Sequence, residues 1–191
     1  ALFTNTTGAS NLGLGFQALY ANTTADGNTG VGYRALLLNT TGASNVAVGA
    51  LALDANTTAS FNVGVGSGAL GGNTTGAHNI GIGADALIAN TTGTRNIAIG
   101  SNAYNSSDTE SDNLAIGYNA MTANTAGGQY NIAIGNYAGD AITSGDNNTV
   151  MGHNVASNLT TGGNNVGIGM DALLATSTQS DNTAIGYQAL R

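Results

Sequence analysis

Hydrophobic and polar positions alternate along the chain in one short phrase that returns about every 17 residues. In the copy "NVAVG" at 45–49, two valines flank a small alanine, and a glycine ends the run. Alternation with a period of two is typical of a β-strand. The pattern therefore predicts one short strand in each of eleven copies, which begin at Asn11, Asn28, Asn45, Asn62, Asn79, Asn96, Asn113, Asn131, Asn148, Asn165 and Asn182.

The spacing of the copies indicates a repeat architecture. Every interval is 17 residues except that from Asn113 to Asn131, which is 18. The extra residue falls in "NTAGGQY" at 124–130, which replaces the more usual "NTTGAS". Solenoids tolerate insertions of this kind because their loops absorb length while the stacked strands stay in register.

Each position of the repeat has its own preference when the asparagine is numbered 1. Position 5 is always glycine and position 4 is always apolar. Position 3 is Gly or Ala except at Val150, position 8 is Ala except at Val155, and position 9 is usually Leu. We expect the aliphatic residues at positions 2 and 4 to share one buried face of the strand. The glycine predicts a bend that needs a positive φ or brings another chain too close for a Cβ.

The cycle of strand, bend, short apolar stretch and polar turn predicts an all-β protein. We expect a parallel β-solenoid or β-roll of eleven coils of about 17 residues, stacked about 4.8 Å apart. A helical interpretation fails because glycines recur in every copy. A triangular hexapeptide β-helix also fits poorly, since 17 is not a multiple of six. The whole of 1–191 then forms a single repeat array, which we expect to be a segment of a longer fibre.

Burial within one such chain is small. Each coil offers about three sizeable apolar side chains, worth roughly 1.5 to 3 kcal/mol each when buried, while ordering 17 residues costs on the order of 25 kcal/mol. We therefore expect further burial between chains, intertwined or packed as a homotrimeric fibre. The small residues at positions 3 and 8 would permit close packing along the shared axis.

Composition excludes several kinds of partner. The chain has three cations, Arg34, Arg95 and Arg191, against ten carboxylates, and its formal net charge is −7. Such a chain offers no basic patch for nucleic acid or for an anionic membrane surface. No stretch approaches the roughly 20 apolar residues of a membrane span. It contains no cysteine, so we expect no disulfides and no thiolate metal sites.

The repeated phrases carry a family likeness over essentially the whole chain. "NVAVG", "NIAIG" and "NTAIG" resemble the strand phrase of the head domains of trimeric autotransporter adhesins. The longer "NTTGASNVAVG" and "NTAIGYQAL" resemble repeat arrays of phage tail fibres and bacterial surface fibres. The first resemblance implies a left-handed parallel β-roll wound as a trimer. Both imply an extracellular protein, on a cell surface or a virion.

One acidic loop is a candidate metal site. "DTESD" places Asp108, Glu110 and Asp112 at alternate positions, and three carboxylates on one side of an extended loop can bind Ca²⁺. The alternative is a solvated acidic loop. We expect no other cofactor and no catalytic residues, because His78 and His153 lack an oriented partner and no serine has a histidine and a carboxylate at a suggestive spacing.

The sequence therefore predicts a structural protein rather than an enzyme. We expect the shaft of an adhesin or tail-fibre protein, acting as a rigid spacer with a possible weak surface for a receptor or glycan. The alternative is a single-chain ice-binding solenoid, since stacked "NTT" turns form regular polar ladders. The same "NTT" phrases match the N-glycosylation acceptor, although turn formation also explains them.

Overall fold

The computed structural model of the protein describes residues 1–124 and 127–191, and within them it confirms an all-β parallel solenoid without helices. Eleven strands of three residues each form one sheet in chain order. The strands are β1 (Leu12–Leu14), β2 (Thr29–Val31), β3 (Val46–Val48), β4 (Val63–Val65), β5 (Ile80–Ile82), β6 (Ile97–Ile99), β7 (Leu114–Ile116), β8 (Ile132–Ile134), β9 (Thr149–Met151), β10 (Val166–Ile168) and β11 (Thr183–Ile185).

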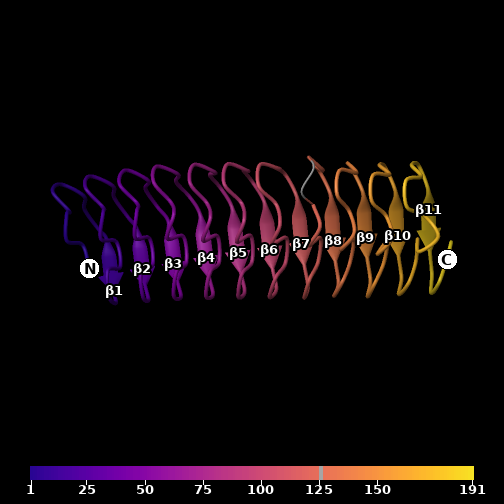
Figure 1. Ribbon diagram of the computed structural model, residues 1–191, viewed down its shortest axis with the longest axis horizontal. Coiled ribbons are helices and arrows are strands. Elements are labelled where there is room, and N and C mark those ends of the chain that lie inside the picture. Colours follow the sequence, from indigo (N-terminus) through magenta and orange to yellow (C-terminus); the bar gives the residue numbers. More distant parts are fainter. Residues whose placement is uncertain (125–126) are drawn as a thin grey trace.

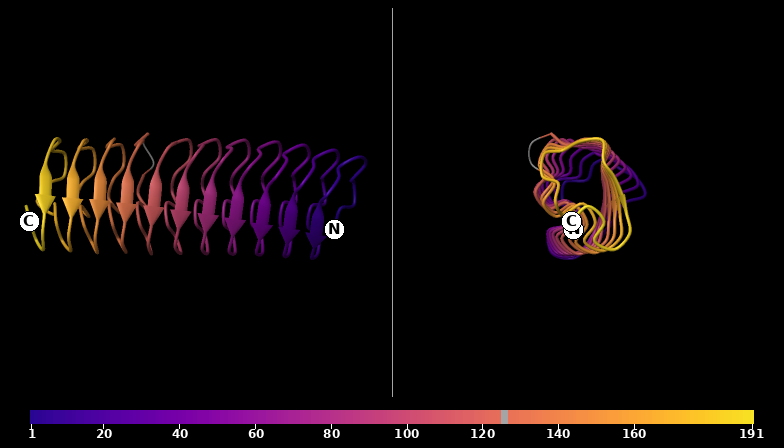
Figure 2. Two further views of the ribbon diagram at one scale, coloured as in Figure 1. Left: turned by 180° about the vertical axis from the view of Figure 1, so that it is seen from behind. Right: turned by 90° about the vertical axis from the view of Figure 1, so that its right-hand side faces the viewer.

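The coils stack into a straight rod with the two termini at opposite ends (Figure 1). Seen along the rod, successive coils lie almost on top of one another (Figure 2). The register explains this regularity, because equivalent residues pair directly: Val46 lies opposite Val63, which lies opposite Ile80. With a spacing of about 4.8 Å between parallel strands, the eleven coils make a rod roughly 50 Å long.

The strands turn their small residues inward and their large ones outward. Ala47 at position 3 is completely buried, whereas Val48 at position 4 is 38% exposed. There is little room inside, because a Cβ added to Gly64 would lie 3.0 Å from the carbonyl oxygen of Ala69. Positions 3 and 8 therefore line the interior of their own chain. The expectation that positions 3 and 8 pack along an axis between chains is wrong, because these positions are already buried within one chain. The expectation that positions 2 and 4 form a buried face is also wrong for the single chain, in which position 4 is partly exposed.

The interior is filled mainly from positions 9 and 12, whose sizes compensate one another. The five coils of β1 to β5 combine a buried leucine at position 9 with a buried asparagine at position 12, such as Leu53 with Asn56. Where position 12 is Ile142, position 9 is Gly139. A Cβ on Gly139 would approach Cδ1 of Ile142 to 2.8 Å. A large side chain at one position thus requires a small one at the other.

Asparagine side chains connect each coil to the next. At position 1, the backbone N–H of Asn62 donates to Oδ1 of Asn45 at 3.0 Å, and Nδ2 of Asn62 donates to the carbonyl oxygen of Gly76 at 2.9 Å. At position 12, Nδ2 of Asn73 donates to Oδ1 of Asn56 at 3.0 Å and to Gly76 at 2.9 Å. Buried polar groups cost little only when they are paired in this way. These two ladders make the polar interior stable.

The position 12 ladder is interrupted in the coil of β6. Ser107 replaces asparagine there, and within the described residues Oδ1 of Asn90 and Oγ of Ser107 have no hydrogen-bond partner. Tyr104 takes the place of the usual leucine, and its hydroxyl accepts from Nδ2 of Asn113 at 2.6 Å and of Asn124 at 3.1 Å. Burial raises the pKa of Tyr104 above its usual value. The phenol thus restores part of the polar pairing that the serine loses.

The glycine at position 5 meets both conditions that the sequence suggested. Gly49 has φ +141°, in the region that side chains disfavour. An added Cβ would also collide with the carbonyl group of Gly66, the equivalent residue of the next coil. The tight stacking of the coils thus depends on glycine at this bend.

Replacing Gly49 by alanine is expected to destabilise the protein by roughly 3 kcal/mol or more, since backbone strain and a steric clash add together. Denaturant unfolding measures the change. The matched control is Gly27→Ser, because Gly27 also has a positive φ, the nearest atom to an added Cβ is 3.7 Å away, and serine occupies the same repeat position at Ser10 and Ser44. Equal losses for the two variants would contradict the stacking account.

Candidate functional site

The described residues enclose no pocket, so any functional site there must lie on the surface of the rod. Ligand-binding and catalytic sites usually lie in concave pockets with a few convergent polar groups. The described residues form no concave pocket of this kind. The sites predicted from sequence must therefore be assessed by where the coils place their side chains.

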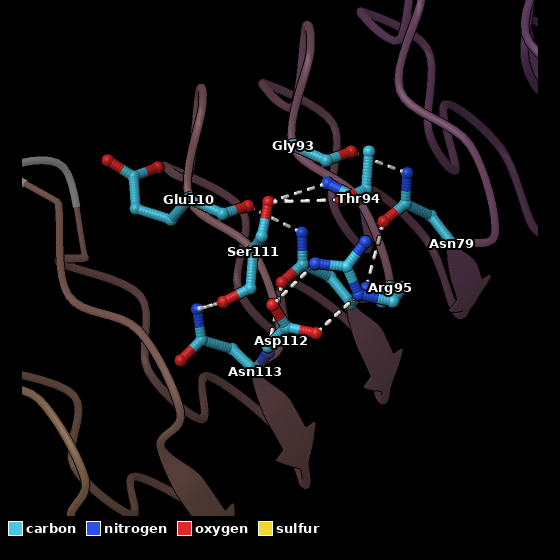
Figure 3. A network of polar contacts seen from close by, with 9 residues as sticks. Asn79, Gly93, Thr94, Arg95, Glu110, Ser111, Asp112 and Asn113 are labelled. Carbon is cyan, nitrogen blue, oxygen red and sulfur yellow. Dashed lines mark hydrogen bonds and ion pairs between the residues drawn. The ribbon is translucent and has the colours of Figure 1, made fainter.

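The three carboxylates of the acidic loop have different partners. Figure 3 shows Glu110 and the pair of Asp112 with Arg95. Asp112 binds Arg95 of the preceding coil through two contacts, at 2.5 Å to Nε and 2.7 Å to Nη2. The hydrogen bond from Arg95 lowers the pKa of Asp112 below its usual value. Asp108 accepts a hydrogen bond from the hydroxyl of Thr91. Among the described residues, no group of three such ligands is placed to hold a metal ion.

Glu110 turns into the structure and closes the polar turn. It is only 3% exposed, and its Oε2 accepts from the backbone N–H of Asp108 at 2.8 Å and of Thr109 at 3.1 Å. Its other carboxylate oxygen accepts from Gly127 N–H at 3.0 Å. Gln179 stands at the same repeat position and makes the equivalent pair of bonds within its own turn, at 2.8 and 3.1 Å. A side-chain oxygen at this repeat position therefore closes the turn in both coils.

The two histidines lie on the surface beside aromatic rings. His78 stacks on Phe61 with ring centroids 5.0 Å apart, and His153 meets Tyr137 edge-on at 6.0 Å. Neither contact includes a carboxylate or a nucleophile. The structure thus gives the histidines aromatic neighbours rather than the oriented partner that acid–base chemistry uses.

Most asparagines of the "NTT" phrases are inaccessible. Their amide groups form the position 12 ladder, and five of them, Asn22, Asn39, Asn56, Asn73 and Asn90, are completely buried. N-glycosylation requires an exposed amide, so these five side chains act in folding. The next position of the turn also supports the stack, because the hydroxyl of Thr40 donates to the carbonyl oxygen of Thr57 at 3.0 Å.

The largest feature of the surface is an aliphatic face that follows the sheet from β1 to β11. We call the side chains at positions 2 and 4 of all coils the strand face. Its centre is exposed, with Ile82 at 37% and Ile99 at 36%. At the two ends position 4 is more open, with Leu14 at 63% and Ile185 at 66%. A continuous apolar surface of this length is typical of an interaction site.

Sequence reasoning identified the residues of the strand face but placed them inside. Alternation shows that positions 2 and 4 share a face without showing which face is internal. The signal that decides the question is the size of position 3, where Gly or Ala occurs in every coil but that of Val150. Because leucine and asparagine side chains from positions 9, 12 and 1 already fill most of the interior, position 3 of the strand is mostly small and the large side chains of positions 2 and 4 face outward.

Comparisons of the chain with models of protein families, with curated proteins and with solved structures gave no match. The stacked parallel strands of the structure are therefore the evidence for the solenoid fold. Across the ranges described, no helix is long and apolar enough to cross a membrane.

Replacing Glu110 by alanine is expected to cost about 2 kcal/mol or more, because three backbone N–H groups lose their hydrogen-bond acceptor. Glu110→Gln retains most of the stability, since Gln179 closes the equivalent turn. Millimolar CaCl₂ leaves the midpoint of thermal unfolding unchanged. A midpoint that rises with calcium in the natural chain but not in Glu110→Ala would contradict this account and restore the metal site.

Proposed function

We propose that the protein is a structural fibre shaft, a rigid spacer in which copies of the chain cover one another's strand faces. The observation that carries this proposal is the strand face itself, in which position 4 is apolar in every coil and position 2 is aliphatic in all coils but those of Thr29, Thr149 and Thr183. It follows a rod without a pocket in its described part. A soluble monomer rarely exposes such a surface. Enzymatic activity forms no part of the proposal.

The area of the strand face supports association of this chain with itself. About a third of each central position 4 side chain is exposed, and position 2 adds a second rank beside it. Together they present on the order of 1,000 Å² of apolar surface, similar to the roughly 800 Å² that each partner buries in a standard interface. Copies of one chain also share the 17-residue period, so every coil finds an equivalent partner.

Three copies about a common axis are the arrangement that we propose. Each would turn its strand face toward the axis, which adds the large aliphatic core that the narrow interior of one chain lacks. The likeness of "NTAIGYQAL" to tail-fibre and surface-fibre repeats supports this arrangement. It also supports a place outside the cell, on a bacterial surface or a virion, where the shaft of an adhesin or tail fibre holds a binding tip at a distance.

Ice binding remains a second candidate because one rank of threonines is exposed. Position 14 carries threonine in seven successive coils, all of them exposed: Thr7, Thr24, Thr41, Thr58, Thr75, Thr92 and Thr109. The threonines at position 13 are mostly half-buried and bind the next coil. A thermal-hysteresis assay decides this candidate, since the absence of activity at high protein concentration would exclude it.

The strand face predicts how the chain associates. The natural chain is expected to sediment as a trimer. The double variant Ile82→Glu, Ile99→Glu is expected to sediment as a monomer, because association would bury two charges in each copy. The matched control is Ile88→Glu, since Ile88 is also 37% exposed but lies outside the strands. Sedimentation equilibrium measures the masses, and circular dichroism checks folding. A natural chain that is monomeric at all concentrations would refute the proposal.

A further inference from the structure

One corner of the coil varies in residue type from coil to coil, as positions 6 and 7 of the repeat also do. Position 17, directly before the buried asparagine, carries a different kind of residue from coil to coil. The backbone at this corner is left-handed throughout, with φ between 57° and 69° at all of its described members. They are Ser10, Gly27, Ser44, Phe61, His78, Arg95, Asp112, Tyr130, Asn147, Asn164 and Asp181.

The central members of this corner conflict with their backbone. Left-handed conformation favours glycine, asparagine and aspartate. The outer coils follow that preference or use serine, whereas Phe61, His78, Arg95 and Tyr130 are bulky. Residues kept in a disfavoured conformation need a compensating reason. The same holds for Leu51 and Tyr137 at position 7, where φ is 59° and 58°.

Packing inside the chain does not supply that reason. Phe61 is 56% exposed and Tyr130 is 58% exposed. The side chain of Arg95 is 59% exposed. Large rings that stay in water gain little from burial, so their conformational cost is not offset within the described fold.

These side chains form an ordered stripe at the edge of the strand face. Phe61 and His78 stack in parallel, with an interplanar angle of 9°. The next two members, Arg95 and Asp112, are held together by their two contacts (Figure 3). Tyr130 follows on the next coil. The stripe thus has an aromatic residue at each end and a fixed ion pair between them, over five coils or roughly 20 Å.

We propose that this stripe, Phe61–His78–Arg95–Asp112–Tyr130, binds a neutral glycan chain. Exposed aromatic rings provide flat apolar platforms with polarised C–H and π faces, against which the C–H face of a pyranose ring packs. The Arg95–Asp112 pair offers donors and acceptors side by side, which match the hydroxyls of a sugar. The coil spacing is comparable with the length of one pyranose ring, so successive sugars meet successive coils.

The charge of the stripe selects a neutral ligand. The charges of Arg95 and Asp112 cancel, while the chain as a whole carries a formal net charge of −7. A glycan rich in carboxylate or sulfate groups would be repelled by that field. This inference rests on the proposed function only in placing the shaft where it meets glycans, since the stripe is complete within one chain.

The test uses isothermal titration of the full chain with cellohexaose, chitohexaose, maltohexaose and mannohexaose, and with a heparin hexasaccharide as the anionic probe. At least one neutral oligosaccharide is expected to bind. The double variant Phe61→Ser, Tyr130→Ser is expected to lower the affinity for it by about tenfold, the factor expected when two aromatic contacts are lost. Serine occupies this corner in two other coils, so the variant is expected to fold. The matched control, Tyr187→Ser, removes an equally exposed ring at position 6 and leaves the affinity unchanged.

Each other outcome overturns the inference. Binding of none of the neutral probes, binding of heparin alone, or equal losses in the variant and the control would each exclude this site. Sedimentation of the same samples separates this result from the proposed shaft. A double variant that loses its oligomeric mass would show that the stripe belongs to the interface between copies, whereas loss of glycan affinity at an unchanged mass supports the site.

Discussion

The structure depends on the hydrogen bonds by which each coil repeats the one before it. The asparagine at position 1 carries this constraint most directly, because its side chain accepts from the backbone of the equivalent asparagine one coil further on. The bond from Asn79 N–H to Asn62 Oδ1, at 2.9 Å, recurs with little change from one end of the rod to the other. A contact between equivalent positions can be satisfied only by a chain that repeats itself, so the ladder requires an asparagine at position 1 of each coil. The bond also spans the 18-residue step from Asn113 to Asn131, at 2.9 Å.

The narrow interior of the coil determines which side chains lie on the surface. Polar ladders, alanines and one or more larger apolar side chains in each coil from that of β1 to that of β10 fill the interior. Glycine at position 5 lets adjacent backbones approach closely. No space is left inside for the larger residues of the strands. These side chains face outward. The single chain therefore has a small apolar core and exposes an apolar surface that other copies can bury. In this way the interior accounts for the proposed fibre.

The sequence was sufficient to predict the strands, their parallel order and the bends at glycine, because each of these follows from local spacing. It did not show which strand face is internal, since the choice depends on the width of the whole coil. It also suggested that the asparagines of the "NTT" phrases form surface turns, whereas Asn56 and Asn73 lie in a buried ladder. The carboxylates of 108–112 illustrate the same limit. Their partners, such as Arg95 for Asp112, come from the preceding coil and so are distant in sequence.

The most direct test of this account is hydrogen exchange of the asparagine side-chain amides, measured by NMR on ¹⁵N-labelled protein. The ladders at positions 1 and 12 predict that the Nδ2 protons of residues such as Asn45, Asn62 and Asn73 exchange slowly, at rates similar to those of the strand backbone. Exchange as fast as that of exposed asparagines such as Asn147 would contradict the ladders. It would also contradict the narrow polar interior from which the outward strand face follows.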